Sequence, residues 1–197
     1  MDAPGVARGR RAFLAPVWLT MLGALAVAAL GVAWLRSGTT TTIIVIRNAE
    51  QQFGTIDDPP LSSEGERRAV RLAQLLGSKP VTANSTAASA FAAVEVGAVY
   101  AAETRRAQQT AAAVTQLLGF PMITFPSGSV SAAVDRALKE QRGRAAVIVG
   151  DAQDVQAALA QLSGAPQASV VKPADYGTVY IVTKPTFSPI AVLALNY

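Results

Sequence analysis

The chain of 197 residues contains neither cysteine nor histidine. Without cysteine it can form no disulfide, no zinc–thiolate site and no thiol nucleophile. Without histidine it lacks the commonest general base at neutral pH and the commonest metal ligand. The sequence also shows no metal-ligand spacing, no glycine-rich phosphate loop and no serine-based triad. We therefore expect neither a metal nor any other cofactor.

Charged residues are scarce, at 15% of the chain, and they are unevenly distributed. Much of the net charge of +4 comes from four arginines near the amino terminus, where Asp2 is the only acid. From residue 40 onward, 13 basic residues face 12 acidic ones. A nucleic-acid-binding domain needs a basic face. This balance therefore argues against nucleic acid as a partner.

Residues 12–35 form the longest hydrophobic run, 24 consecutive positions without a charge. As a helix they would reach about 36 Å, enough to cross a hydrocarbon core of about 30 Å. Arginines stand on both sides, three of them before the run, and Trp18 and Trp34 lie near its ends as interfacial anchors. We predict a single-pass transmembrane helix, with residues 1–11 in the cytoplasm and the remainder in the periplasm or cell exterior.

The export route remains open between two alternatives. Residues 10–14, Arg-Arg-Ala-Phe-Leu, resemble a twin-arginine signal, but an ordinary basic flank is the reading that we favour. A cleaved signal peptide is disfavoured, because the run is long and residues 32–35 offer no small-residue cleavage site. Each reading places the domain outside the cytoplasm, with the membrane as a partner.

Beyond a polar linker at 36–42, residues 43–197 show strands alternating with helices. Strands are predicted at 43–46, 99–100, 122–125, 146–149, 178–183 and 190–195, and helices from Ser62 or Ser63, then at 105–118, 131–142 and 153–162. Residues 79–96 are difficult to assign. This alternation predicts a three-layer α/β/α sandwich with a mostly parallel sheet and an antiparallel final pair of strands.

Functional groups in such sheets collect at the carboxyl ends of the strands. Residues 47–50 and 151–153 follow the two most apolar strands, so the site is expected there.

Four segments carry recognisable motifs. Residues 42–50 read Thr-Ile-Ile-Val-Ile-Arg-Asn-Ala-Glu; residues 58–62 read Asp-Pro-Pro-Leu-Ser; residues 99–111 include Val-Tyr-Ala and Arg-Ala-Gln-Gln-Thr-Ala; and residues 147–151 read Val-Ile-Val-Gly-Asp. In this order they resemble the motifs of the histidine phosphatase (phosphoglycerate mutase-like) superfamily, and the end of the chain resembles its small exported members. The resemblance covers nearly all of 42–197 and implies the phosphoglycerate mutase-like fold.

In that family one histidine is phosphorylated, a second completes the site, and two arginines bind the phosphoryl oxygens. The resemblance assigns the arginine positions to Arg47 and Arg106, whereas the histidine positions hold Asn48 and Asp151. An amide nitrogen has no basic lone pair, so Asn48 cannot accept a phosphoryl group as an imidazole does. The expected set of catalytic residues is therefore empty, and Arg47 and Arg106 remain as anion-binding candidates.

A carboxylate at position 151 is also expected to pair with Arg47 and Arg106 and to repel phosphate. Glu50 or Glu103 would join the same ion-pair cluster. An acid–base role for these two glutamates, or a nucleophilic role for Asp151, is the weaker alternative.

The function that these residues favour is non-catalytic: a pseudophosphatase that serves as a scaffold, sensor or accessory subunit of a membrane complex, with a protein partner. Two alternatives remain. One is a divergent exported phosphomonoesterase that uses Arg47 and Arg106. The other is a module that binds phosphorylated ligands without cleaving them.

Overall fold

The computed structural model describes residues 17–54, 57–77, 95–164, 176–185 and 190–197. The chain divides into two compact units, Met1–Ser37 and Gly38–Tyr197. Most of the described part of the first unit is helix α1 (Val17–Thr39). Residues 36–42, predicted to form a linker, comprise the end of α1, Thr40 and the first two residues of the next strand.

Helix α1 carries apolar side chains around its circumference. Its large ones, from Trp18 to Val32, are each at least half exposed. The predicted span 12–35 is covered only in part, since residues 12–16 and the side chains of 33–35 lie outside the described residues. Within the portion that is described, no helix is long and apolar enough to cross a membrane.

The second unit is built around one six-stranded sheet in the order β3-β2-β4-β1-β5-β6. The strands are β1 (Thr41–Arg47), β2 (Val96–Ala102), β3 (Met122–Phe125), β4 (Ala145–Gly150), β5 (Thr178–Lys184) and β6 (Ala191–Asn196). Strands β3, β2, β4 and β1 run parallel, while β5 is antiparallel to both β1 and β6. The prediction of a mostly parallel sheet with an antiparallel final pair is confirmed.

Strands β1 and β4 form the centre of the sheet because their sequences suit burial on both faces. Residues 43–46 and all six residues of β4 are buried. Their β-branched side chains pack well on a pleated surface that is covered on both sides. The two strands therefore hold in place the residues that follow their carboxyl ends, Asn48 after β1 and Asp151 after β4.

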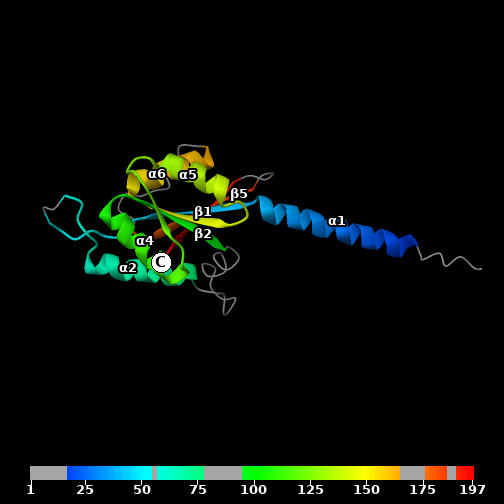
Figure 1. The fold of residues 1–197 in the computed structure, drawn as a ribbon, viewed down its shortest axis with the longest axis horizontal. Coiled ribbons are helices and arrows are strands. Elements are labelled where there is room, and N and C mark those ends of the chain that lie inside the picture. Colours follow the sequence, from blue (N-terminus) through cyan, green and yellow to red (C-terminus); the bar gives the residue numbers. More distant parts are fainter. Residues whose placement is uncertain (1–16, 55–56, 78–94, 165–175, 186–189) are drawn as a thin grey trace, which may run out of the picture. The chain divides into compact units, whose positions relative to one another are not determined.

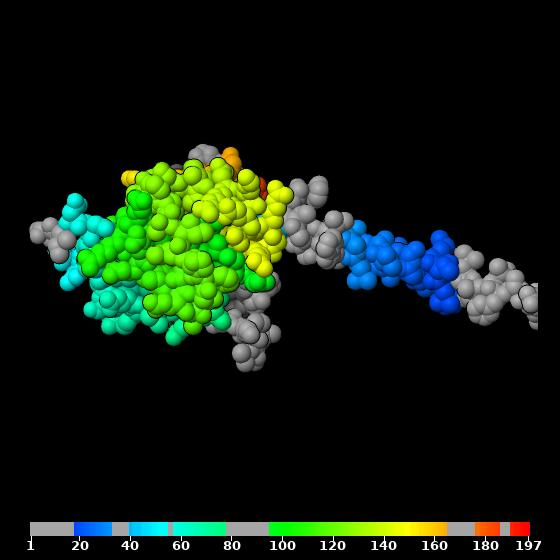
Figure 2. Space-filling view, in the orientation of Figure 1, coloured from blue at the N-terminus to red at the C-terminus, as the bar shows by residue number. Residues whose placement is uncertain are grey.

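Among the described residues, four helices cover the sheet: α2 (Ser63–Gly77), α4 (Arg105–Leu118), α5 (Val130–Glu140) and α6 (Ala152–Ser163). Figure 1 shows α2 and α4 on one face and α5 and α6 on the other, and each pair packs together. In the same orientation, Figure 2 shows the green part of the chain on the face of the second unit that is toward the viewer. The predicted three layers are thus present.

Local signals set most helix boundaries. The Ser62 hydroxyl accepts the Gly65 N–H at 3.1 Å, so Ser62, one of the two predicted caps, closes the start of α2. Helix α5 begins one residue earlier and ends two residues earlier than predicted. Of the stretch 79–96 that the sequence left unassigned, residues 79–94 lie outside the described residues, and Val96 begins β2.

Candidate anion-binding site

The carboxyl ends of β1 and β4 meet, as the sequence predicted. The two strands are paired in parallel with Arg47 opposite Gly150, and the Asn48 N–H donates to the Gly150 carbonyl at 2.7 Å. Strand β2 lies on the other side of β4 and leads directly into α4. Arg47, Asn48, Arg106 and Asp151 therefore gather at one edge of the sheet, although they are far apart in the sequence.

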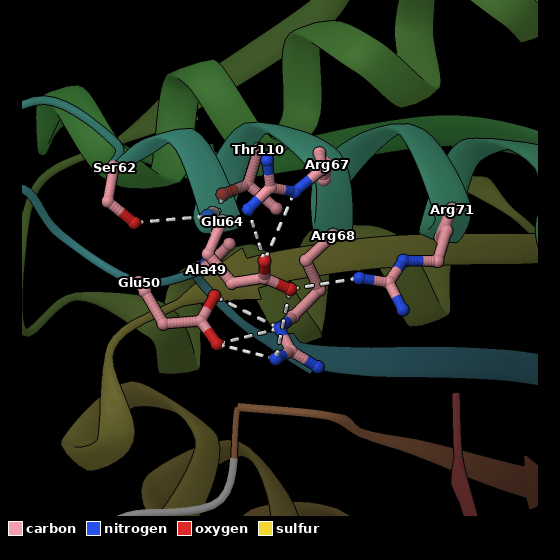
Figure 3. Close-up of polar contacts among 9 residues, drawn as sticks. Ala49, Glu50, Ser62, Glu64, Arg67, Arg68, Arg71 and Thr110 are labelled. Carbon is pink, nitrogen blue, oxygen red and sulfur yellow. Dashed lines mark hydrogen bonds and ion pairs between the residues drawn. The ribbon is translucent and has the colours of Figure 1, made fainter.

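Thr110 fixes the loop after β1 to helix α4. Its hydroxyl accepts the Ala49 N–H at 3.1 Å and donates to the Arg106 carbonyl at 2.8 Å. Figure 3 shows the Thr110 side chain beside Ala49. The preceding residue of α4, Gln109, accepts the Leu61 N–H through its side-chain oxygen at 2.8 Å. These bonds hold the loop that follows Arg47 against helix α4, which carries Arg106.

Arg47 lies over an aromatic ring. Its guanidinium carbon is 4.0 Å from the centroid of the Tyr176 ring, a cation–π contact that orients the side chain. Its Nε and Nη1 atoms are buried, and neither has a hydrogen-bond partner. The side chain thus offers N–H donors that nothing in the described part of the chain accepts.

Arg106 and Asn48 also have unsatisfied donors. Arg106 donates from Nη1 to the Gln51 side-chain oxygen at 2.6 Å, but its buried Nε has no partner. Asn48 is only 2% exposed, and its Nδ2 is likewise unpartnered. A buried donor without an acceptor costs about 1–3 kcal/mol, and more when it is charged. Such groups usually mark a place for water or an ion.

Asp151 does not neutralise the arginines, so the predicted charge cancellation is wrong. One of its carboxylate oxygens accepts the N–H groups of Gln153 and Asp154, each at 2.8 Å, and caps helix α6. Its negative charge is stabilised by these amides and by the positive end of the helix dipole. Among the described residues, no ion pair joins Asp151 to Arg47 or Arg106.

Asp154 completes the amino-terminal cap of α6. Its carboxylate accepts the Asp151 N–H at 3.2 Å, and burial raises the pKa of this carboxyl. A Cβ on Gly150 would come within 2.5 Å of the Asp154 Cβ, so β4 can end this close to the helix only at a glycine. The packing of Asp154 on Gly150 therefore fixes where Asp151 lies.

Glu50 is also absent from the predicted cluster, because it binds Arg68 instead. The Arg68 Nε atom donates to both Glu50 oxygens, at 2.8 and 3.0 Å. The Nη2 atom of Arg68 also lies 2.7 Å from Oε1 of Glu50. Figure 3 shows Arg68 reaching this carboxylate from α2. The hydrogen bonds to Glu50 raise the pKa of the guanidinium. The other arginines of α2, Arg67 and Arg71, are exposed and bind Glu64.

Close contact between α2 and the first motif depends on Gly65. A Cβ at this position would collide with the Glu50 carbonyl oxygen, which accepts the Ser62 N–H at 2.9 Å. Glu103, the other predicted member of the cluster, is exposed and makes no ion pair with a described residue. An acid–base pair of Glu50 and Glu103 has no support, since Glu50 is held by Arg68.

The two candidate arginines thus carry positive charge that no described carboxylate pairs with. Three residues of this site were not predicted as members: Gln51, Thr110 and Tyr176. Gln51 directly follows the first motif and Thr110 lies one turn after Arg106, so position alone could have suggested them. Tyr176 lies just before β5, and its contact with Arg47 was not predictable from its position, because only folding brings β5 beside β1. Among the described residues, no cluster of acidic side chains could hold a metal ion.

Comparison with known proteins identifies the fold. Three solved structures are similar: the protein histidine phosphatase SixA in complex with tungstate (15% identity, TM-score 0.58, 79% of this chain and 96% of that one), a mycobacterial glucosyl-3-phosphoglycerate phosphatase (13%, 0.55, 80% and 99%), and the phosphoglycerate mutase of Plasmodium falciparum (16%, 0.53, 79% and 89%). No curated protein matches the chain significantly.

The sequence model of the histidine phosphatase superfamily (branch 1) matches residues 33–127. This range includes the positions of Arg47, Asn48 and Arg106, and the similar structures extend the likeness over about four-fifths of the chain. Residues 33–127 therefore match the histidine phosphatase superfamily, and the similar structures share the fold of the chain.

Proposed function

We propose that this domain binds phosphate monoesters through Arg47, Arg106 and Asn48 and does not hydrolyse them. The observation that carries the proposal is a set of four buried donor atoms without an acceptor: Nε and Nη1 of Arg47, Nδ2 of Asn48 and Nε of Arg106. They come from two motifs that the fold holds at one edge of the sheet.

A phosphate oxyanion suits this arrangement chemically. It offers several strong acceptor oxygens and negative charge, so it would satisfy the buried donors and pair with two guanidinium groups. Asp151 does not compete for the guanidinium groups, because its carboxylate is committed to the cap of α6. Tyr176 and Gln51 would hold the two arginines in place before a ligand arrives. The similar SixA structure is described as a complex with tungstate, an analogue of phosphate.

Hydrolysis is not expected, because the chain has no histidine to accept the phosphoryl group. Loss of a nucleophile costs on the order of 10⁶ in rate in a well-studied protease. Asn48 can donate a hydrogen bond to an oxyanion but cannot attack phosphorus. Binding without turnover favours the sensor among the roles that the sequence suggested. A scaffold or accessory subunit would need no anion site.

The decisive experiment restores the missing groups. The full chain in detergent is titrated calorimetrically with tungstate and phosphoserine, and its hydrolysis of p-nitrophenyl phosphate is measured beside an Asn48→His/Asp151→His variant. We expect the wild type to bind both anions without turnover, and the double variant to gain at least about a hundredfold in hydrolysis, the scale of general acid–base help alone.

An Arg106→Ala variant is the control for both measurements. Wild-type turnover that disappears in this control would favour the divergent phosphomonoesterase and end the proposal of a non-hydrolysing site. Failure of the wild type to bind either anion would argue against the site itself and leave a pseudophosphatase scaffold as the better account.

We also propose that residues 12–35 anchor the domain in a membrane, with the domain on the outer side. The 24 uncharged positions, their arginine flanks and the exposed apolar side chains of α1 support this. Alkaline carbonate extraction of cell membranes tests it: the full chain is expected in the pellet. Release of the full chain into the supernatant would contradict the anchor.

A further inference from the structure

The two edges of the sheet differ in how they are protected. At one edge, β3 has four residues and lies between Pro121 and Pro126, neither of which can donate to a ladder. Short, proline-bounded edges of this kind resist pairing with another chain. The other edge, β6, has six residues and contains no proline, glycine or charge. Strand β6 itself therefore lacks the protection that proline, charge or a very short length would give.

Strand β6 is also unusually exposed for its composition. It reads Ala-Val-Leu-Ala-Leu-Asn, and every residue except Leu195 is exposed. Val192 and Leu193 point to opposite faces of the sheet, yet they remain 37% and 42% exposed. Both faces of the strand are therefore open, and its described neighbour in the sheet is β5 alone.

The ladder between β5 and β6 shows which backbone groups are free. The Tyr197 N–H donates to the Gly177 carbonyl at 2.9 Å, so this pair is a hydrogen-bonded one. Hydrogen-bonded and non-hydrogen-bonded pairs alternate along an antiparallel ladder. Thr178 and Asn196 form the next pair, and their side chains contact each other at 2.8 Å, as in a non-hydrogen-bonded pair. Val192, Ala194 and Asn196 therefore direct their N–H and C=O groups outward from the sheet.

We infer that β6 pairs with β6 of a second copy of this chain, antiparallel and about a two-fold axis at Ala194. A two-fold axis brings a strand antiparallel to itself. Pairing Ala194 with Ala194 of the second copy places Val192 opposite Asn196, so all three outward residues of β6 enter hydrogen-bonded pairs. The absence of charge in β6 means that identical strands meet without repulsion.

The side chains agree with this register. It places Leu193 of each copy opposite Leu195 of the other, so four leucines gather on one face of the continuous sheet. Shifting the axis to Leu193 would place Leu195 opposite Ala191 and would leave part of this apolar surface open. The pairing goes beyond the proposed ligand binding and does not depend on it.

The natural absence of cysteine gives a clean test by cross-linking. In the inferred register, the Cα atoms of the two Ala194 residues lie about 5.5 Å apart, within the roughly 4.4–6.8 Å that a disulfide requires. An Ala194→Cys variant of the full chain in detergent is oxidised with copper phenanthroline and run on a non-reducing gel. We expect at least about five times more cross-linked dimer than from Ala132→Cys, a control at an exposed alanine of α5.

A second variant, Ala194→Lys, puts like charges opposite each other while leaving the bonds to β5 intact. Sedimentation should then show the wild type as a dimer and Ala194→Lys as a monomer at the same concentration. Equal masses for these two proteins would overturn the inference, and so would equal cross-linking of the Ala194→Cys and Ala132→Cys variants. Stronger cross-linking from Leu193→Cys than from Ala194→Cys would overturn the Ala194 register.

Discussion

Arginine side chains have opposite roles at two neighbouring places in this domain. Arg68 is paired, since Glu50 accepts from its Nε and Nη2 atoms at distances of 2.7 to 3.0 Å. Arg47 and Arg106, on the other side of the same motif, keep buried N–H groups without acceptors. A buried cation that has its own carboxylate is structural, whereas a buried cation without one is prepared for an anion from outside.

The difference arises from a single residue, Glu50, at the end of the first motif. Its backbone holds the start of α2 through Ser62, while its side chain faces Arg68. Arg47, three residues earlier, faces Tyr176. Had Glu50 turned to Arg47 or Arg106 instead, the site would be neutralised, and Arg68 would keep only the more distant Glu64 carboxylate, at 4.0 Å. The fold thus keeps the Glu50–Arg68 ion pair apart from the candidate anion site, although Glu50 is only three residues from Arg47 in the sequence.

The largest expected effect comes from removing each cation in turn and comparing the affinity for an anion. Arg106→Gln should weaken tungstate binding by about 1.5–3 kcal/mol, roughly tenfold to 150-fold, because it removes charge-assisted hydrogen bonds to the anion. Arg68→Gln should change the same affinity by less than about threefold, since Arg68 already serves Glu50. Calorimetric titration of the full chain in detergent measures both. An equal loss in the two variants would mean that the anion does not lie between Arg47 and Arg106.

A smaller effect is expected on stability when the ion pair between Glu50 and Arg68 is removed. Glu50→Gln should lower the free energy of unfolding by about 1–2 kcal/mol, because it removes the nearer carboxylate of Arg68 and leaves only Glu64, at 4.0 Å. This is less than for a fully buried pair, as the two side chains are 19% and 22% exposed. Combining Glu50→Gln with Arg68→Met should recover part of the loss, which urea denaturation of the four proteins in a double-mutant cycle would show.

The chain supplies a matched control for this cycle. Arg136 and Glu140 form an exposed pair on α5, four residues apart. Arg136→Gln should cost less than about 0.5 kcal/mol, as for most surface ion pairs. A loss as large as that of Glu50→Gln would imply that the Glu50–Arg68 pair has no special role in holding α2 against the first motif.

Much of the fold was predictable from local pattern. The apolar runs at 43–46 and 146–149 are buried strands, and the helix from Arg105 to Leu118 has the predicted bounds. The meeting of Arg47, Asn48, Arg106 and Asp151 was predictable because parallel strands bring their carboxyl ends to one edge. The predicted membrane span stays a prediction, since part of it lies outside the described residues.

The sequence by itself determined the chemical repertoire: with no histidine or cysteine, the nucleophile of the superfamily is missing, whatever the fold. It also determined the strands and helices, which depend on neighbours in the chain. Only the tertiary structure decided which acid binds which base. Hydrogen bonds act over about 3 Å and need the right direction. Asp151 therefore went to the amides of α6 and Glu50 to Arg68, and the arginines that the sequence paired with them were left open.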